Sequence, residues 1–203
     1  MSSLSSSANF LPMKVYIIGG RGIGEELDIA GISYLGGPAD SEKSAKEDII
    51  IDGNVGAVVV GFDPQINYYK LQYAQLCLNG NKNCHFIATN DDAVGHFTPN
   101  QEWAGAGSMV GAVKGCTNKT PVVVGKPNSV LLDYIVEVSG LSAKMMCMVG
   151  DRIDTDILFG KHNGMTTCLT LSGVTSRQAL DAAGLPADCY PDYVVDSISD
   201  LRV

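Results

Sequence analysis

The chain has 203 residues and a mass of 21.4 kDa, enough for one medium domain or two small ones with a sizeable hydrophobic core. Its 14 basic and 22 acidic residues give a net charge of −8, which argues against nucleic acid or an anionic membrane surface as the main partner. No apolar stretch reaches the roughly 18 to 20 residues of a membrane-spanning helix, and the amino end lacks the features of a secretory signal.

Six cysteines are scattered along the chain without a CxxC pair or any other paired spacing. This usage is typical of a reducing compartment, so we expect a cytoplasmic protein. The three histidines also lack the spacing of metal ligands, and a zinc site is therefore not expected.

The first half of the chain alternates strand and helix signals. Apolar runs that end at Gly, Asp or Pro predict strands, and apolar residues at helical spacing predict helices. The predicted strands are 15–20, 32–37, 56–62 and 85–89, and the predicted helices are 23–30 and 68–78. Residues 93–107 hold His96 and the only tryptophan, and we expect them to form a long polar loop, which is often a functional feature.

The glycine-rich segment GGRGIGEEL, which begins at Gly19, follows the first predicted strand in the way a dinucleotide-binding loop does. In such a loop, glycines let backbone N–H groups approach a pyrophosphate. Counted from Gly20 and Gly22, the third glycine would fall at position 25, which is Glu25. Because a carboxylate there repels phosphate, nucleotide binding is not favoured; retention of a nucleotide through purification would revive it.

The second half continues the same alternation. The predicted strands are 121–125, 145–149, 166–171 and 192–198, and the predicted helices are 108–116 and 128–138, with one more between the strands 145–149 and 166–171. Strands that alternate with helices are typical of the α/β class with a parallel sheet. We expect two α/β regions that divide near residues 105–115.

The apolar run Met145–Val149 breaks at Gly150 and is followed at once by three acids, Asp151, Asp154 and Asp156. In open parallel sheets, sites lie beyond the carboxyl ends of the strands. Clustered carboxylates repel one another unless a cation or proton intervenes, and Mg²⁺ is a suitable cation. The alternative is that Asp154 and Asp156 only start a helix, where acids favour the dipole.

Lys126 stands between a predicted strand and a predicted helix that has Pro127 near its first turn. The amino end of a helix suits an anion, so Lys126 is a candidate for binding one. The alternative is a lysine that is simply solvated at the end of a strand.

Lys126 in VVVGKPNS and Asp151 in VGDRIDTDI resemble the third and fourth motifs of the haloacid dehalogenase (HAD) superfamily of phosphatases. Further strings are similar to its phosphoglycolate phosphatase and 4-nitrophenylphosphatase branch, to which pyridoxal phosphatase is related. They are VVVGFD at 58–63, YYKL at 68–71, ATNDD at 88–92, AGAGSMVGAV at 104–113 and LTLSGVTS at 169–176. The resemblance extends from about Met13 to the end of the chain.

The resemblance implies a Rossmann-like parallel-sheet core covered by a large α/β cap of the C2 type. Residues 1–107 would be the cap, which governs specificity and dimerisation, and residues 108–203 the carboxy-terminal part of the core. The implied activity is Mg²⁺-dependent hydrolysis of small phosphomonoesters through an aspartyl-phosphate. The implied partners are a small phosphate ester and a second copy of the chain, bound through the cap.

The resemblance also implies roles for individual residues. Asp151 would ligate Mg²⁺, and Asp156 would support the metal site from behind or through water. Lys126 would be the catalytic and substrate-binding cation that offsets negative charge on the phosphate and on the attacking carboxylate. Asn90 and His96 would lie in the cap loop that reaches the leaving group of the substrate.

One part of the family pattern is missing from the sequence. Members carry a DxDG motif, in which the first Asp attacks phosphorus and the second protonates the leaving group, and a later Thr or Ser that holds the phosphoryl oxygens. We find neither motif: Asp52 in IIIDG and Asp63 in VVVGFDPQ lack an acid two residues later. We therefore expect the chain to enter the family sequence inside the cap, to have an incomplete core, and to be inactive alone.

An alternative from another class of protein fits the same observations. A non-catalytic binding or regulatory protein could keep the cap as a dimerisation module without the nucleophile. The sequence does not choose between these two functions, nor between phosphoglycolate, pyridoxal phosphate and other small esters as substrates.

Overall fold

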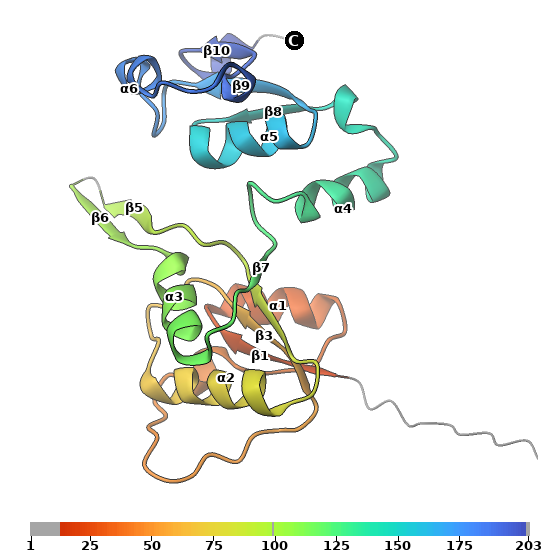
Figure 1. Cartoon of the computed structure of the whole chain (residues 1–203), viewed down its shortest axis with the longest axis vertical. Coiled ribbons are helices and arrows are strands. Elements are labelled where there is room, and N and C mark those ends of the chain that lie inside the picture. Colours follow the sequence, from red (N-terminus) through yellow and green to blue (C-terminus); the bar gives the residue numbers. More distant parts are fainter. Residues whose placement is uncertain (1–12, 99, 202–203) are drawn as a thin grey trace, which may run out of the picture. The chain divides into compact units, whose positions relative to one another are not determined.

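The computed structural model describes residues 13–98 and 100–201, and the chain divides between Val123 and Val124 into two units (Figure 1). The division lies further along the chain than the predicted boundary between residues 107 and 108. The helix α3 (Ala106–Thr117) packs beside α2, and the short strand β7 (Val122–Val123) pairs with β4, so both belong to the first unit.

The first unit contains a sheet of parallel strands in the order β2-β1-β3-β4-β7. Its other strands are β1 (Lys14–Ile18), β2 (Tyr34–Gly36), β3 (Val55–Val60) and β4 (His85–Ala88). Its helices besides α3 are α1 (Arg21–Ile29), α2 (Tyr68–Gly80) and the short 3₁₀ helix η1 (Gly37–Asp40). These elements confirm the predicted α/β alternation.

The core of the first unit lies between the sheet and the helices α2 and α3. Alternate residues of the strands, such as Ile18 and Val58, point to this side because successive side chains of a strand face opposite ways. They pack against Cys77 of α2 and Val113 of α3, and all four are fully buried. The helix α1 lies across the sheet from α2 (Figure 1).

The predicted loop 93–107 is wrong in part, because it contains an antiparallel hairpin of β5 (Val94–Thr98) and β6 (Gln101–Ala104). The residues of β6 are all exposed, and Phe97 in β5 is exposed as well. Such a hairpin shows no alternation of buried and exposed positions, which is the pattern that predicts a strand. The indole N–H of Trp103 donates to Thr98 Oγ1 at 2.9 Å, which links the two strands.

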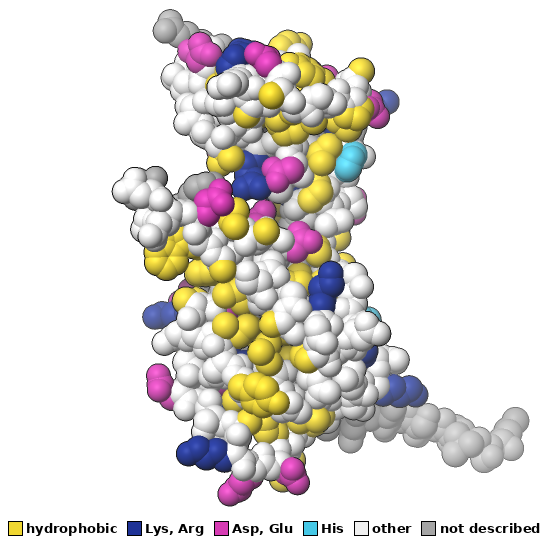
Figure 2. Space-filling view, turned by 60° about the vertical axis from the view of Figure 1, so that its left-hand side comes forward, with side chains coloured by type: hydrophobic (Ala, Val, Ile, Leu, Met, Phe, Trp, Pro, Cys, Tyr) yellow, Lys and Arg dark blue, Asp and Glu magenta, His cyan; other side chains and the backbone are white. Residues whose placement is uncertain are grey.

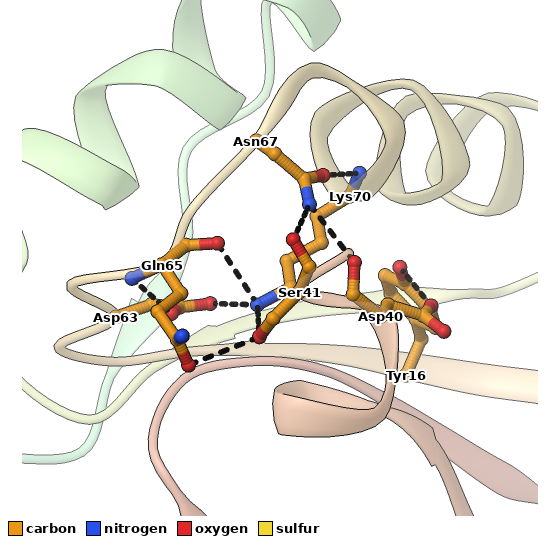
Figure 3. A network of polar contacts seen from close by, with 7 residues as sticks. All are labelled: Tyr16, Asp40, Ser41, Asp63, Gln65, Asn67 and Lys70. Carbon is orange, nitrogen blue, oxygen red and sulfur yellow. Dashed lines mark hydrogen bonds and ion pairs between the residues drawn. The ribbon is translucent and has the colours of Figure 1, made fainter. Parts of the chain in front are cut away.

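A buried polar network joins the loops at one end of this sheet (Figure 3). The Lys70 ammonium lies 2.8 Å from Asp63 Oδ2, and their side chains are 0% and 3% exposed. Asn67 caps α2 by accepting the backbone N–H of Lys70, and its amide group donates to the backbone carbonyl oxygens of Asp40 and Ser41. The segment that follows η1 is therefore fixed to the amino end of α2.

The second unit contains parallel strands in the order β10-β9-β8. The strands are β8 (Cys147–Gly150), β9 (Thr166–Thr170) and β10 (Tyr193–Val195). The helices are α4 (Val130–Ser139), α5 (Leu158–His162) and α6 (Arg177–Ala182), with short helical turns at η2 (Ala143–Met145), η3 (Ile153–Ile157), η4 (Ala187–Cys189) and η5 (Ile198–Asp200). Ile157, Leu169 and Leu180 form its buried core.

Apolar side chains of the second unit remain at its surface. Within the described residues, β8 pairs only with β9, so its other edge is open. In α4, only Leu132 is buried, whereas the side chains of Tyr134 and Val138 are more than half exposed. A helix of this composition normally buries such residues.

Figure 2 shows apolar side chains at the surface among charged ones of both signs. Among the helices that the structure describes, none is long and apolar enough to cross a lipid bilayer.

Candidate functional site

Lys126 and Asp156 form an ion pair in the second unit. The Nζ atom of Lys126 lies 2.5 Å from Oδ1 of Asp156, and the lysine side chain is 38% exposed while the carboxylate is 6% exposed. Lys126 stands before α4, whereas Asp156 belongs to the π-helical turn η3 that follows β8. The fold thus brings together a cation and an anion from two segments that the sequence keeps apart.

The second oxygen of Asp156 holds the loop after β8. Its Oδ2 accepts the backbone N–H groups of Asp151 and Arg152, both at 3.1 Å. A Cβ atom at Gly150 would collide with this carboxylate, so only glycine leaves room for it. Both oxygens of Asp156 are therefore occupied, one by the Lys126 ammonium and the other by the loop after β8.

Asp151 is held by the loop after β9. Its Oδ2 accepts the backbone N–H of Val174 at 2.8 Å, and its carbonyl oxygen accepts the N–H of Thr175 at 3.1 Å. Gly173 lies directly against the carboxylate, with no space for a Cβ atom. No hydrogen bond to Oδ1 of Asp151 occurs among the described residues, so this oxygen can accept a cation.

The donor set fits one side of a Mg²⁺ site. Mg²⁺ prefers oxygen ligands and is often bound by only one or two carboxylates, with water and substrate phosphate completing the octahedron. The carboxylate of Asp151 matches this chemistry. In the part of the chain that the structure describes, no group of three or more His, Cys, Asp or Glu side chains could enclose a metal ion. Further ligands would have to be water, substrate or other protein groups.

The charges of the cluster also suit a divalent cation. Lys126 carries one positive charge, and Asp151 and Asp156 carry one negative charge each. Once Lys126 and Asp156 are paired, the carboxylate of Asp151 leaves a net negative charge, which attracts a cation. With a divalent cation bound, the cluster becomes positive and attracts a phosphate group.

Asp154 is paired with Arg152. Its carboxylate is 2.7 Å from Nη2 of Arg152, and its side chain is 65% exposed. The hydrogen bonds from Arg152 hold the pKa of Asp154 below its usual value, so this carboxylate stays ionised.

The other two predicted site residues, Asn90 and His96, belong to the first unit. Asn90 follows β4, where its Oδ1 accepts from Thr89 Oγ1 at 2.9 Å and its amide group donates to Asp92 Oδ2 at 2.7 Å. Asn90 is therefore fixed within its own loop. His96 lies in β5, and its side chain is outside the described part of the structure.

Two glycines of the site were not predicted from the sequence to be site residues. Gly150 and Gly173 have their backbones against the carboxylates of Asp156 and Asp151. Gly150 is the last residue of β8, in VGDR, and Gly173 lies in the loop after β9, in LSGVT. Only the three-dimensional arrangement shows which carboxylate each one approaches.

Comparisons with known proteins show which proteins this chain is similar to. A family model described as "HAD-hyrolase-like" matches residues 123–201. The chain is 54% identical over 192 residues to "Phosphoglycolate phosphatase 2" of Arabidopsis thaliana, which covers 93% of this chain and 63% of that protein. It is 39% identical over 193 residues to "Chronophin" of Rattus norvegicus, which covers 94% of this chain and 58% of that protein.

Solved structures give the same family. The "p-nitrophenyl phosphatase from Archaeoglobus fulgidus" matches with a TM-score of 0.74 and 33% identity, over 93% of this chain and 66% of that chain. The 4-nitrophenylphosphatase of Thermotoga maritima matches with a TM-score of 0.72 and 28% identity, over 91% of this chain and 62% of that chain.

The matches confirm the predicted resemblance and the predicted α/β fold class with a Rossmann-like parallel sheet. The chain spans 63% of the Arabidopsis phosphoglycolate phosphatase 2 and 58% of the rat chronophin, that is, less than two thirds of these curated relatives. It belongs to the HAD-like hydrolases, in the branch of the phosphoglycolate phosphatases and 4-nitrophenylphosphatases.

Proposed function

We propose that this chain carries the lysine and the metal-binding acid of a Mg²⁺-dependent phosphatase that acts on small phosphomonoesters such as phosphoglycolate or 4-nitrophenyl phosphate. The observation that carries the proposal is the convergence of Lys126, Asp151 and Asp156 in one unit, with a distance of 2.5 Å between Lys126 Nζ and Asp156 Oδ1. The names of the relatives support the same substrate class.

Each residue of the cluster has a defined task in this proposal. Asp156 holds the Lys126 ammonium in place, so the charge is positioned before the substrate arrives. Lys126 stabilises negative charge on the phosphoryl oxygens. Asp151 offers Oδ1 to Mg²⁺, which when bound neutralises phosphate charge and acts as a Lewis acid. Val174 keeps the Asp151 carboxylate in a fixed orientation through its backbone N–H.

The covalent step of the family reaction needs a carboxylate that attacks phosphorus. Of the two aspartates that come nearest to the motif in sequence, Asp63 is buried in its pair with Lys70. Asp52 lies 2.9 Å from Lys14 Nζ and also accepts the backbone N–H of Asn54. Since neither has the partner acid of the DxDG motif, we propose that these 203 residues do not hydrolyse phosphate esters alone.

We further propose that the first unit acts as the cap and mediates homodimerisation. The exposed rings of Phe62 and Phe97, whose centroids are 5.0 Å apart, and the exposed ring of Trp103 support this. Exposed aromatic side chains are enriched in protein interfaces. The six free thiols are consistent with a reducing compartment such as the cytoplasm.

The test is a chimeric enzyme. The amino-terminal part of Arabidopsis phosphoglycolate phosphatase 2 that precedes its match to this chain is fused before Met13, and Mg²⁺-dependent phosphate release is measured with both esters. The chimera should be active and the 203-residue chain inactive. Activity of the chain alone would overturn the inactivity proposal. A folded but inactive chimera would favour the non-catalytic alternative.

A further inference from the structure

A cavity of about 300 Å³ lies in the first unit, away from the residues used so far. Its volume is at the lower end of the range for small-molecule sites, roughly 300–1,000 Å³. The residues that matter for its chemistry are Tyr16, Tyr34, Asp40, Lys43, Tyr69 and Tyr73. The cavity therefore combines aromatic walls with one carboxylate and one ammonium group.

The carboxylate of Asp40 is fixed and almost completely buried. Its side chain is 6% exposed, and its Oδ2 accepts the hydroxyl of Tyr16 at 2.9 Å (Figure 3). Burial, together with the charge of Asp40, raises the pKa of Tyr16, so this hydroxyl stays protonated and keeps donating. The cavity thus has a permanent acceptor, Oδ1 of Asp40, for a cationic N–H group.

The aromatic rings provide further attraction for a cation. Tyr16 and Tyr73 stack with their centroids 4.3 Å apart, and Tyr69 lies 6.0 Å from Tyr73. The Lys43 ammonium lies 5.0 Å from the centroid of the Tyr69 ring and 2.7 Å from Asp40 Oδ1. A cation over an aromatic face is stabilised by the quadrupole of the ring. Lys43 thus shows that the Asp40 carboxylate and the Tyr69 ring together bind a primary ammonium group.

Lys43 can leave this position without releasing the segment around it. Its side chain is 51% exposed, so solvent reaches it. The neighbouring backbone is held independently, because the Asn67 amide donates to the carbonyl oxygens of Asp40 and Ser41 at 2.8 and 3.0 Å. Displacement of Lys43 would therefore expose Asp40 Oδ1 and the Tyr69 ring to a ligand while the cavity keeps its shape.

We propose that this cavity binds a small primary ammonium group from solution, in competition with the side chain of Lys43. A primary ammonium can donate an N–H to Asp40 Oδ1 and place its charge over the Tyr69 ring. A quaternary ammonium has no N–H group, so it can only place its charge over the ring. An anion meets the charge of Asp40 and is repelled. This site is independent of the phosphatase proposal, since it uses none of the residues of the Lys126 cluster.

The test is a titration of the ¹⁵N-labelled chain with n-butylammonium, followed by amide shifts of residues 35–43. Lys43→Ala, which removes the internal competitor, should bind n-butylammonium about tenfold more tightly than the wild type. Lys46→Ala, an exposed lysine on the same segment, is the matched control and should equal the wild type. Tetramethylammonium should bind more weakly than n-butylammonium, and butyrate should not bind.

The proposal is wrong if Lys43→Ala and the wild type bind n-butylammonium equally, or if neither binds it. A second variant tests the site itself. Adding Tyr69→Leu to Lys43→Ala removes the ring but leaves Asp40 paired with Tyr16, so the fold should survive, and binding should fall at least severalfold. Unchanged binding in this double variant would show that the ligand lies elsewhere.

Discussion

The ammonium of Lys126 lies 2.5 Å from the carboxylate of Asp156, a residue that follows it by 30 positions in the chain. The same carboxylate binds the backbone N–H of Asp151 through its other oxygen. Asp156 therefore couples the position of the cation to that of the acid proposed to bind metal. A substitution at any of the three residues should therefore change the positions of the other two.

Mg²⁺ binding should depend on Asp151 and not on Asp154. Asp151→Asn removes the charge that attracts a cation, whereas Asp154→Asn removes a carboxylate that is paired with Arg152 at the surface. Mn²⁺ can replace Mg²⁺ as a paramagnetic probe, since it prefers similar oxygen ligands. It should broaden the amide signals of residues 150–152 and 174 in the wild type and in Asp154→Asn. Equal broadening in Asp151→Asn would contradict the metal assignment.

Gly150→Ala should destabilise the second unit. The added Cβ would meet the Asp156 carboxylate, which is held by Lys126 and by two backbone N–H groups and cannot move freely. We expect a loss of about 1–3 kcal/mol in the free energy of unfolding. Gly111→Ala in α3 is the control, because nothing lies within 4 Å of its Cβ position. Thermal unfolding should show a lower Tm only for Gly150→Ala.

The buried pair of Asp63 and Lys70 should tolerate joint replacement better than loss of one partner. Lys70→Met leaves a buried carboxylate without its cation, which typically costs about 3–5 kcal/mol. Adding Asp63→Asn removes the uncompensated charge and keeps an acceptor for the backbone N–H of Gln65. Urea denaturation should therefore rank the double variant above Lys70→Met. The reverse order would mean that the charge of Asp63 is not the source of the loss.

The sequence predicts those elements whose pattern of apolar residues lies within a single segment of the chain. The strand predicted at 56–62 and the helix predicted at 68–78 rested on their own apolar patterns, and the structure confirms both elements, at Val55–Val60 and Tyr68–Gly80. The hairpin of β5 and β6 was missed because its stabilisation comes from pairing between exposed segments, not from burial of an apolar face. The placement of α3 was missed because helix signals do not reveal which sheet a helix packs on.

The candidate site shows the same limit. Lys126, Asp151 and Asp156 could be selected from their position after strands and from the family resemblance, and their roles remain predictions. A Cβ atom at position 173 would collide with the carboxylate of Asp151. The sequence could not predict this, because the contact forms where the loops after β8 and β9 meet. The contact between Asp151 and the backbone of Val174 arises in the same way, 23 residues apart in sequence.

The pKa of Asp192 makes a further prediction about stability in acid. The hydrogen bond from Lys161, together with those from the backbone and side chain of Thr167, holds the pKa of Asp192 below its ordinary value of 3.8. A carboxylate with a lowered pKa in the folded state stabilises the fold above the unfolded value and loses this effect as the pH falls through the folded value.

Asp192→Asn should therefore reduce the Tm at pH 6 and have a smaller effect below the folded pKa of Asp192, where the wild-type carboxyl is protonated as well. The measurement is thermal unfolding of both proteins between pH 2 and pH 6. A difference in Tm that is constant over this range would contradict the link to the charge of Asp192. Asp188→Asn, at an aspartate for which no ion pair is seen among the described residues, serves as the control.

Whether Lys126 binds phosphate together with Asp151 is tested most directly by kcat for 4-nitrophenyl phosphate in the active chimera with and without Lys126→Ala. Loss of a positioned cation should lower kcat by about 10²–10³, while Lys144→Ala, a lysine of the same unit outside the cluster, should leave kcat unchanged. A folded Lys126→Ala chimera with the kcat of its parent would contradict the account.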